Sequence, residues 1–110
     1  MHGISPKIQA IYCPMSETTF YVLLSLTEPN YGYSISQEVM DLTLGEVRLS
    51  PGTLYGSLKK LLQDGLIQLD HQVGRRRLYV LTEVGEALLD IEKRRIKRLF
   101  ANAQGMAYRE

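Results

Sequence analysis

The chain has 110 residues, of which 45% are hydrophobic and 23% are charged, which is typical of one folded domain with its own core. Its single cysteine, Cys13, excludes an internal disulfide framework and is consistent with a reducing, cytoplasmic location. No apolar run is long enough to span a membrane, and the N-terminus shows no signal-peptide pattern.

Positive charge is confined to the second half of the chain. The net charge of +1 favours no particular partner. Residues 1–47 carry one basic and five acidic residues, a balance of −4, whereas residues 48–98 carry eleven basic and six acidic residues, a balance of +5. This asymmetry is expected of a chain with one surface facing nucleic acid, although basic residues that only solvate helix faces would give the same count.

Residues 1–14 contain two prolines and little periodicity, which predicts an N-terminal tail or an apolar packing arm. The first helix is predicted from Ser16, its N-cap, to about Thr27, before Pro29. Residues 20–24 leave this helix almost no polar face, so it must be covered on more than one side. One cover is its own domain, and the second is either the C-terminal helix or another subunit.

Two further helices are predicted before the strands. The second follows a turn at residues 29–32 and covers residues 34–42, with inward positions at Ile35, Val39 and, as a further candidate, Leu42. The third begins after Ser50, because a serine N-cap followed by proline is a strong start signal, and it ends at Gly65. Its apolar face is predicted to be core and consists of Leu54, Leu58, Leu61 and Leu62.

A hairpin and a long C-terminal helix are predicted after the three helices. Residues 66–72 and 76–81 are predicted strands of a hairpin, and Thr82 caps a long helix that reaches about Ala103. The predicted fold is therefore mainly α with a small β-hairpin (α+β), a winged helix-turn-helix with a long C-terminal dimerisation helix. Many DNA-binding modules of this arrangement place their third helix in the major groove.

The outer face of the third helix carries small and hydroxyl-bearing residues first and basic residues later. Two glycines near its start cost helix stability, roughly 1 kcal/mol each relative to alanine. Close approach to DNA explains them, while the alternative is a surface helix without a partner. The candidate DNA contacts are Ser50, Pro51, Gly52, Thr53, Tyr55, Gly56, Lys59 and Lys60.

The hairpin turn carries Arg75, Arg76 and Arg77, three adjacent like charges that phosphates would neutralise. Strand alternation predicts that the three do not all face the same way, with Arg75 and Arg76 near the tip and Arg77 beside Tyr79. An arginine at the tip can also enter the minor groove. The alternative is a solvated loop.

The start of the second helix is a further candidate, because helix N-terminal amides favour an anion. The hydroxyls of Tyr33 and Ser34 can touch the DNA backbone there. The alternative is a turn with tyrosines packed beneath it.

The C-terminal helix carries an apolar stripe, broken around Arg95, and a charged side that includes Glu92. The domain has little surface left to cover the stripe, which favours pairing with a second copy over folding back on the same subunit. The predicted dimer-interface residues are Phe20, Leu24, Leu88, Ile91, Ile96, Leu99 and Phe100.

Nothing indicates an enzyme, a cofactor or a metal site. His2, His71 and Cys13 show no metal-ligand spacing, no phosphate-binding glycine motif is present, and no serine has an identifiable base partner.

Taken in order, these motifs resemble the PadR family of transcriptional regulators over about residues 16–100. The motifs are Tyr31-Gly32-Tyr33-Ser34-Ile35, Leu49-Ser50-Pro51-Gly52-Thr53-Leu54-Tyr55, Leu58-Lys59-Lys60-Leu61, Asp64-Gly65-Leu66-Ile67, Gly74-Arg75-Arg76-Arg77 and Tyr79-Val80-Leu81-Thr82-Glu83-Val84-Gly85. The resemblance implies a winged helix of the short subfamily, with one dimerisation helix, usually a repressor. Some short members look like sensors that bind flat aromatic compounds with a tryptophan of this helix, whereas this chain has none and carries Ile96 nearby.

The sequence thus predicts an arm (1–14), a DNA-binding domain (15–81) and a dimerisation helix (82–110). The expected function is a homodimeric regulator, a repressor, on a pseudo-palindromic operator in double-stranded DNA, with a small-molecule effector as a further partner. The competing hypothesis is a winged helix whose basic face docks on an acidic protein. That module would show no preference between duplex sequences.

Overall fold

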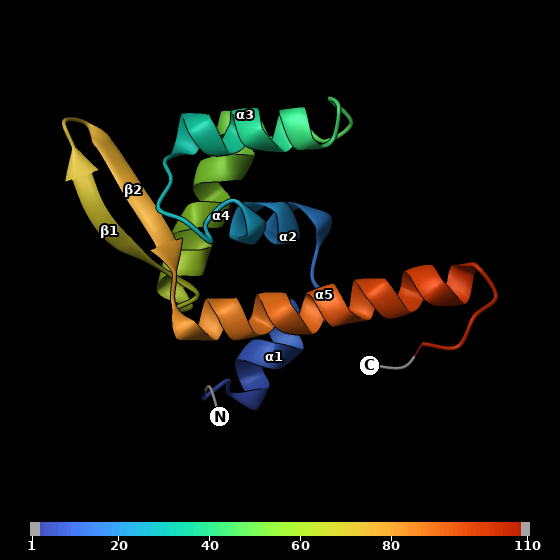
Figure 1. The fold of residues 1–110 in the computed structure, drawn as a ribbon. Coiled ribbons are helices and arrows are strands. Elements are labelled where there is room, and N and C mark those ends of the chain that lie inside the picture. The colour runs from blue at the N-terminus through green and yellow to red at the C-terminus, as the bar shows by residue number, and fades with distance from the viewer. Residues whose placement is uncertain (1–2, 109–110) are drawn as a thin grey trace.

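A computed structural model of the protein describes residues 3–108, so His2, one of the two histidines, lies outside the described residues. The described residues form five helices and one antiparallel hairpin (Figure 1). These elements are α1 (Pro6–Tyr12), α2 (Glu17–Leu24), α3 (Gly32–Leu42), α4 (Pro51–Gln63), β1 (Ile67–Val73), β2 (Arg76–Leu81) and α5 (Glu83–Ala103). The winged-helix order predicted from the sequence is confirmed. No helix among them is long and apolar enough to cross a membrane.

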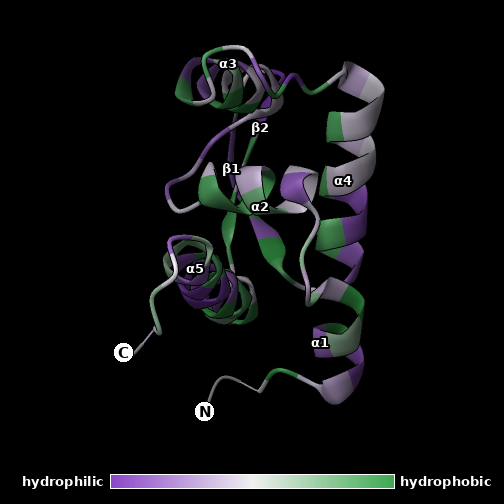
Figure 2. Cartoon of the chain, turned by 90° about the vertical axis from the view of Figure 1, so that its right-hand side faces the viewer, coloured by the Kyte–Doolittle hydropathy of each residue, from purple (hydrophilic) through white to green (hydrophobic). Residues whose placement is uncertain are grey.

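Helix α2 lies at the centre of the core. It contacts α3, α4 and α5, and both views place it between α3 and α5 (Figures 1 and 2). Val22 and Leu23, together with Leu26 just after the helix, are completely buried. The second element that covers this apolar helix is therefore α5 of the same chain. Phe20 and Leu24 of α2 remain half-buried.

Three predicted helix starts are confirmed by capping hydrogen bonds, whereas α3 begins two residues before the predicted position and has no side-chain cap. The hydroxyls of Ser16, Ser50 and Thr82 each accept a bond from the backbone N–H three residues ahead, at 3.1, 3.2 and 3.2 Å. Each bond satisfies an N–H that has no partner inside the helix. At the other end of α4, Gly65 takes φ +76°, the left-handed conformation that suits glycine.

The start of α5 lies close against the two residues that precede β1. The Thr82 hydroxyl donates to the Gly65 carbonyl (2.6 Å), and the Thr82 N–H donates to the Leu66 carbonyl (3.0 Å). Gly85 lies so close that an added Cβ would overlap the Leu66 carbonyl oxygen. Only glycine lets the first turn of α5 approach the Leu66 backbone in this way.

Residues 6–12 form a helix that the sequence analysis did not predict. Ser5 caps it and Pro6 occupies its first turn, but seven residues are too few to show a periodicity. Tyr12 is buried, and its hydroxyl donates to Asp64 Oδ2 at the end of α4 (2.5 Å). Burial and this hydrogen bond raise the pKa of Tyr12 well above its ordinary value. The segment is thus an arm packed on the domain.

Two positions assigned to the core are on the surface. Leu42 at the end of α3 has 65% of its surface exposed, and Leu62 on α4 is also exposed. Helical spacing gives the direction of a side chain around the helix, but not whether another element lies there to cover it. The inward positions Ile35, Val39 and Leu54 are buried as predicted.

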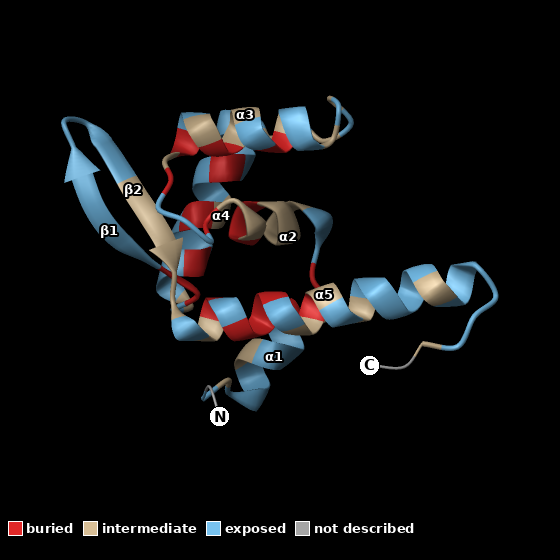
Figure 3. Cartoon of the chain, in the orientation of Figure 1, coloured by how far each residue is buried: buried red, intermediate tan, exposed pale blue. Residues whose placement is uncertain are grey.

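Helix α5 is divided into a buried half and an exposed half (Figure 3). Leu88 is completely buried in the chain's own core, so its assignment to an intersubunit surface was wrong. Glu92 was expected on the charged, solvent-facing side of the helix, but it is only 1% exposed, so this expectation was also wrong. Beyond it, Figure 1 shows the helix extending past the other elements.

The buried Glu92 carboxylate is fully paired. Its Oε1 accepts from the Met15 N–H (2.9 Å) and from Arg95 Nη2 (2.7 Å). Burial alone would raise the pKa of Glu92, but the hydrogen bonds from Arg95 and Met15 and the Arg95 charge outweigh it and hold the pKa below its ordinary value. The break in the apolar stripe of α5 at Arg95 is thus an ion pair that also fixes the α1–α2 connection.

Candidate nucleic-acid interface

The start of α4 presents a row of small residues on the surface. Ser50, Pro51, Gly52, Thr53 and Gly56 are exposed. A Cβ added at Gly52 or Gly56 would meet no atom within 4 Å. Neither glycine is therefore required for packing inside this chain. The Ser50 hydroxyl is already engaged, because it accepts the capping bond from the Thr53 N–H and donates to Thr53 Oγ1 (3.0 Å).

Basic residues follow on the same helix. Lys59 and Lys60 are exposed. Lys60 Nζ lies 3.7 Å from Asp64 Oδ2 and 6.0 Å from the centre of the Tyr12 ring, so part of its charge is balanced within the chain. Lys59 has no such contact in the described residues and is the more available cation.

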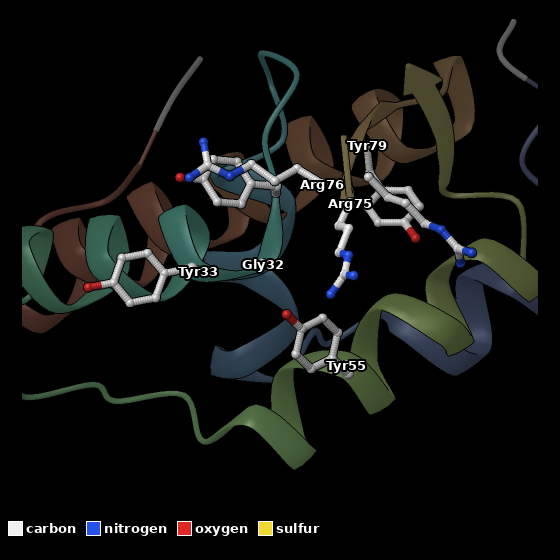
Figure 4. A pocket seen from close by; sticks show the side chains of 8 residues that line it. Gly32, Tyr33, Tyr55, Arg75, Arg76 and Tyr79 are labelled. Carbon is white, nitrogen blue, oxygen red and sulfur yellow. The ribbon is translucent and has the colours of Figure 1, made fainter. Parts of the chain in front are cut away.

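A cleft of about 430 Å³ opens between α4, the start of α3 and the hairpin (Figure 4). Four tyrosines and three arginines surround one glycine in its lining. We call it the tyrosine–arginine cleft, and it comprises Tyr31, Gly32, Tyr33, Tyr55, Arg75, Arg76, Arg77 and Tyr79. Tyr55 belongs both to this cleft and to the exposed face of α4, so the two surfaces adjoin.

The three arginines of the hairpin line this one cleft. Alternation along the strand predicts that they do not all face one way, and in Figure 4 the Arg75 and Arg76 side chains extend in different directions. The Arg76 guanidinium lies 4.6 Å from the centre of the Tyr31 ring, a cation–π contact that holds this side chain in place.

Gly32 sets the position of Tyr55. A Cβ at Gly32 would lie 2.6 Å from the Tyr55 hydroxyl oxygen and 2.9 Å from the ring carbon that bears it. The phenol therefore crosses directly over the glycine at the start of α3. Sequence reasoning treated Gly32 only as a turn residue, and this close approach between two helices had no signal in the linear pattern.

The hydroxyls at the start of α3 are partly engaged. The Tyr33 ring is exposed, and its hydroxyl accepts a hydrogen bond from Gln37 (3.3 Å). The Ser34 hydroxyl donates to Glu38 Oε2 (3.1 Å), which places a carboxylate beside it and makes Ser34 a poor anion contact. Of the two residues predicted here, Tyr33 alone lines the cleft.

Asn30 fixes the hairpin to the helices, a role that the sequence did not reveal. Its backbone pairs with that of Tyr79 in both directions, at 3.0 and 2.8 Å. Its buried side chain accepts from the Tyr31 N–H (2.9 Å) and donates to Glu38 Oε2 (2.5 Å). The proline–asparagine turn was the available signal, but it predicted only a loop.

Apart from the buried Leu88, the predicted intersubunit residues fall into two groups. Phe20, Leu24 and Ile91 are half-buried, whereas Ile96, Leu99 and Phe100 are exposed on the second half of α5. Among residues 3–108, no group of three or more histidine, cysteine or acidic side chains is placed to hold a metal.

Comparison with known proteins gives a consistent picture. The sequence model of the "Transcriptional regulator PadR-like family" matches residues 15–91. The "Transcriptional regulator Rv3488" of Mycobacterium tuberculosis is 41% identical over 61 residues, covering 53% of this chain and 57% of that protein. The chain spans only 24% and 42% of two other curated relatives.

Solved structures share the fold. A PadR family transcription regulator from hypervirulent Clostridium difficile is 28% identical, with a TM-score of 0.67 over 80% of this chain and 97% of that one. Bacillus subtilis PadR, solved in complex with operator DNA, has a TM-score of 0.62 at 24% identity, over 71% of this chain and 47% of that one.

Proposed function

We propose that this chain, which belongs to the PadR-like family of transcriptional regulators, is a homodimeric repressor that binds a pseudo-palindromic operator in duplex DNA. The observation that carries the proposal is the continuity of two surfaces through Tyr55. One is the open glycine-bearing face of α4, and the other is the cationic tyrosine–arginine cleft. A duplex presents base edges and phosphates side by side, which requires such a pair of surfaces.

In this proposal α4 enters the major groove with its N-terminal residues. Gly52 and Gly56 let the backbone approach base edges, and Thr53 supplies a methyl group and a hydroxyl. Lys59 contacts phosphate beside them. The arginines of the hairpin hold the backbone across the groove, where guanidinium binds phosphate oxygens in pairs. Operator DNA in the solved complex of Bacillus subtilis PadR supports this choice of ligand.

A second copy covers the exposed half of α5. Phe100 has 65% of its surface exposed, and Ile96 and Leu99 lie on the same free segment. Exposed apolar residues gathered on one helix mark an association surface. The half-buried Phe20 and Leu24 of α2 are the proposed receiving surface. The two α4 helices of such a dimer would enter successive major grooves about 34–36 Å apart.

The test is binding to DNA from just upstream of the chain's own gene, at about physiological salt, against a scrambled duplex of equal composition. We expect preferential binding by about a thousandfold or more, with two protomers per site. Equal, weak binding to both duplexes would contradict the proposal and favour a basic face that docks on an acidic protein.

Repression and an effector are tested by transcription from the same promoter. We expect added protein to lower transcript yield, because a bound dimer occupies the promoter. A small molecule that acts as effector restores the yield and releases the protein from DNA in stoichiometric amounts. A rise in transcript yield on adding the protein alone would contradict repression.

A further inference from the structure

Helix α1 contacts the end of α4, the helix proposed to enter the major groove. Tyr12, the last residue of α1, is buried, and its hydroxyl donates to Asp64 Oδ2 (2.5 Å) just past the end of α4. Figure 2 shows α1 beside this end of α4, and Ile4 and Ile8 pack against the same core. Because α1 precedes residues 15–91, the family assignment does not account for its contact with α4.

The same carboxylate oxygen holds Lys60, which lies one turn earlier on α4. Lys60 Nζ is 3.7 Å from Asp64 Oδ2 and 6.0 Å from the centre of the Tyr12 ring. The tyrosine hydroxyl and the lysine ammonium group therefore meet at one oxygen, and the ring of the same tyrosine lies near the ammonium. A surface lysine loses much rotamer freedom when it is held, and a carboxylate that a buried tyrosine fixes in place can hold it.

Lys60 can still bind an acceptor on another molecule. Its side chain is 60% exposed, and it follows Gly56 by one turn on the open face of α4. An ammonium group has three N–H donors, and a separation of 3.7 Å from the carboxylate is an ion pair and not a close hydrogen bond. The donors therefore remain able to reach an acceptor on DNA. Their position is set before DNA arrives, which lowers the entropy lost on binding.

We infer, on the basis of the proposed function, that Tyr12 is a positioning residue for operator recognition, because through Asp64 it holds Lys60 where α4 meets the duplex. The held Lys60 serves the operator complex, in which each donor meets a defined acceptor. A loose complex with unrelated DNA depends on the number of positive charges, which Tyr12 does not change. The arm thus contributes to the choice among duplexes through α4.

The test is a double-mutant cycle on the affinities for the upstream duplex and the scrambled duplex, measured by fluorescence anisotropy at fixed salt. Tyr12→Phe keeps the ring and removes only the hydroxyl. We expect it to weaken binding to the upstream duplex by about two- to tenfold, the range of one hydrogen bond, and to leave binding to the scrambled duplex unchanged. In a Lys60→Ala background the same substitution should have no further effect, because the group that it positions is gone.

Two variants separate positioning from a purely structural role. Lys7→Ala removes one positive charge from an exposed position on α1, and in that background Tyr12→Phe should weaken upstream binding as much as in the unaltered chain. Asp64→Asn still accepts the tyrosine hydrogen bond but loses the charge that holds Lys60, so it should lower the ratio of the two affinities. If Tyr12 only stabilised the domain, Tyr12→Phe would weaken binding to both duplexes by one factor in every background, which would overturn the inference.

The mobility of Lys60 in the free protein gives a readout that needs no DNA. Tyr12→Phe should lower the order of the Lys60 ε-methylene group in carbon-13 NMR relaxation. Unchanged order would overturn the inference whatever the duplexes show. Preference for the upstream duplex that Tyr12→Phe leaves intact also overturns it, while the proposed function stands. Equal binding of the unaltered chain to both duplexes overturns the proposed function and the role in recognition together, and lowered Lys60 order would then remain only as a structural fact.

Discussion

Replacing the two open glycines of α4 by alanine should separate stability from DNA binding. Gly52 and Gly56 lie within a helix of 13 residues, and an added Cβ at either position meets nothing within 4 Å. Alanine in place of a helical glycine stabilises a protein by about 0.5–1 kcal/mol. For a domain of this size the midpoint of thermal unfolding should rise by roughly 2–8 °C per substitution. The larger effect is expected at Gly56, deeper in the helix.

The same substitutions should weaken DNA binding. If α4 touches base edges through these glycines, each new methyl group is an overpacking change at a close contact, which costs about 1–3 kcal/mol. That cost corresponds to a loss of affinity of about 5- to 150-fold. Thermal unfolding by circular dichroism and DNA binding by fluorescence anisotropy are measured on the same preparations.

A variant on the same helix controls for alanine itself. Gln63→Ala changes an exposed residue at the far end of α4 and should leave DNA affinity unaltered. Raised stability with unchanged DNA affinity in the Gly52 and Gly56 variants would refute the close approach of α4 to the groove. Lowered stability would instead show that the space around these glycines is not free.

Three further outcomes are expected from other parts of the chain. Gly85→Ala should lower the free energy of unfolding by about 1–3 kcal/mol or more in denaturant titrations, because its Cβ overlaps a backbone carbonyl, and a stable variant would contradict the tight junction. The lowered pKa of Glu92 contributes stability that is present above its unfolded value and lost as pH falls below about 4.3. Glu92→Gln should therefore flatten the acid limb of stability against pH, whereas Glu86→Gln on the exposed side should not. Combined Arg75→Ala and Arg76→Ala should weaken binding to all duplexes and flatten the plot of log affinity against log salt, by about 0.9 for each phosphate that the variant no longer neutralises. An unchanged slope would remove the hairpin from the DNA-binding surface.

Helix and strand positions followed from the sequence because their signals are local. A capping residue forms its hydrogen bond with an amide three positions away, so Ser16, Ser50 and Thr82 indicated helix starts without knowledge of the fold. The hairpin was equally local. Helix α1 was missed because its stability comes from packing, chiefly the burial of Tyr12 against α4, and not from its own pattern.

The errors on α5 have a different physical cause. Periodicity gives the angle of a residue around a helix, but not how many neighbours surround the helix at that height. The first half of α5 is covered by α2 and the α1–α2 connection, so both apolar Leu88 and charged Glu92 are buried there. A buried glutamate is tolerated because Arg95 is one turn away and the Met15 amide points at it.

The sequence predicted individual residues of the candidate site, but not that they line one cleft. The arginines, Tyr33 and Tyr55 were each identified from composition and expected exposure along their own elements. What joins them is a pair of backbone hydrogen bonds between Asn30 and Tyr79, residues separated by two helices and a strand in the chain. That pairing sets the distance of the hairpin from α3, and hence whether guanidinium and phenol groups line one cleft. An asparagine that fastens a wing has the same sequence signature as one that only turns a loop, so the cleft becomes visible only when the chain is folded.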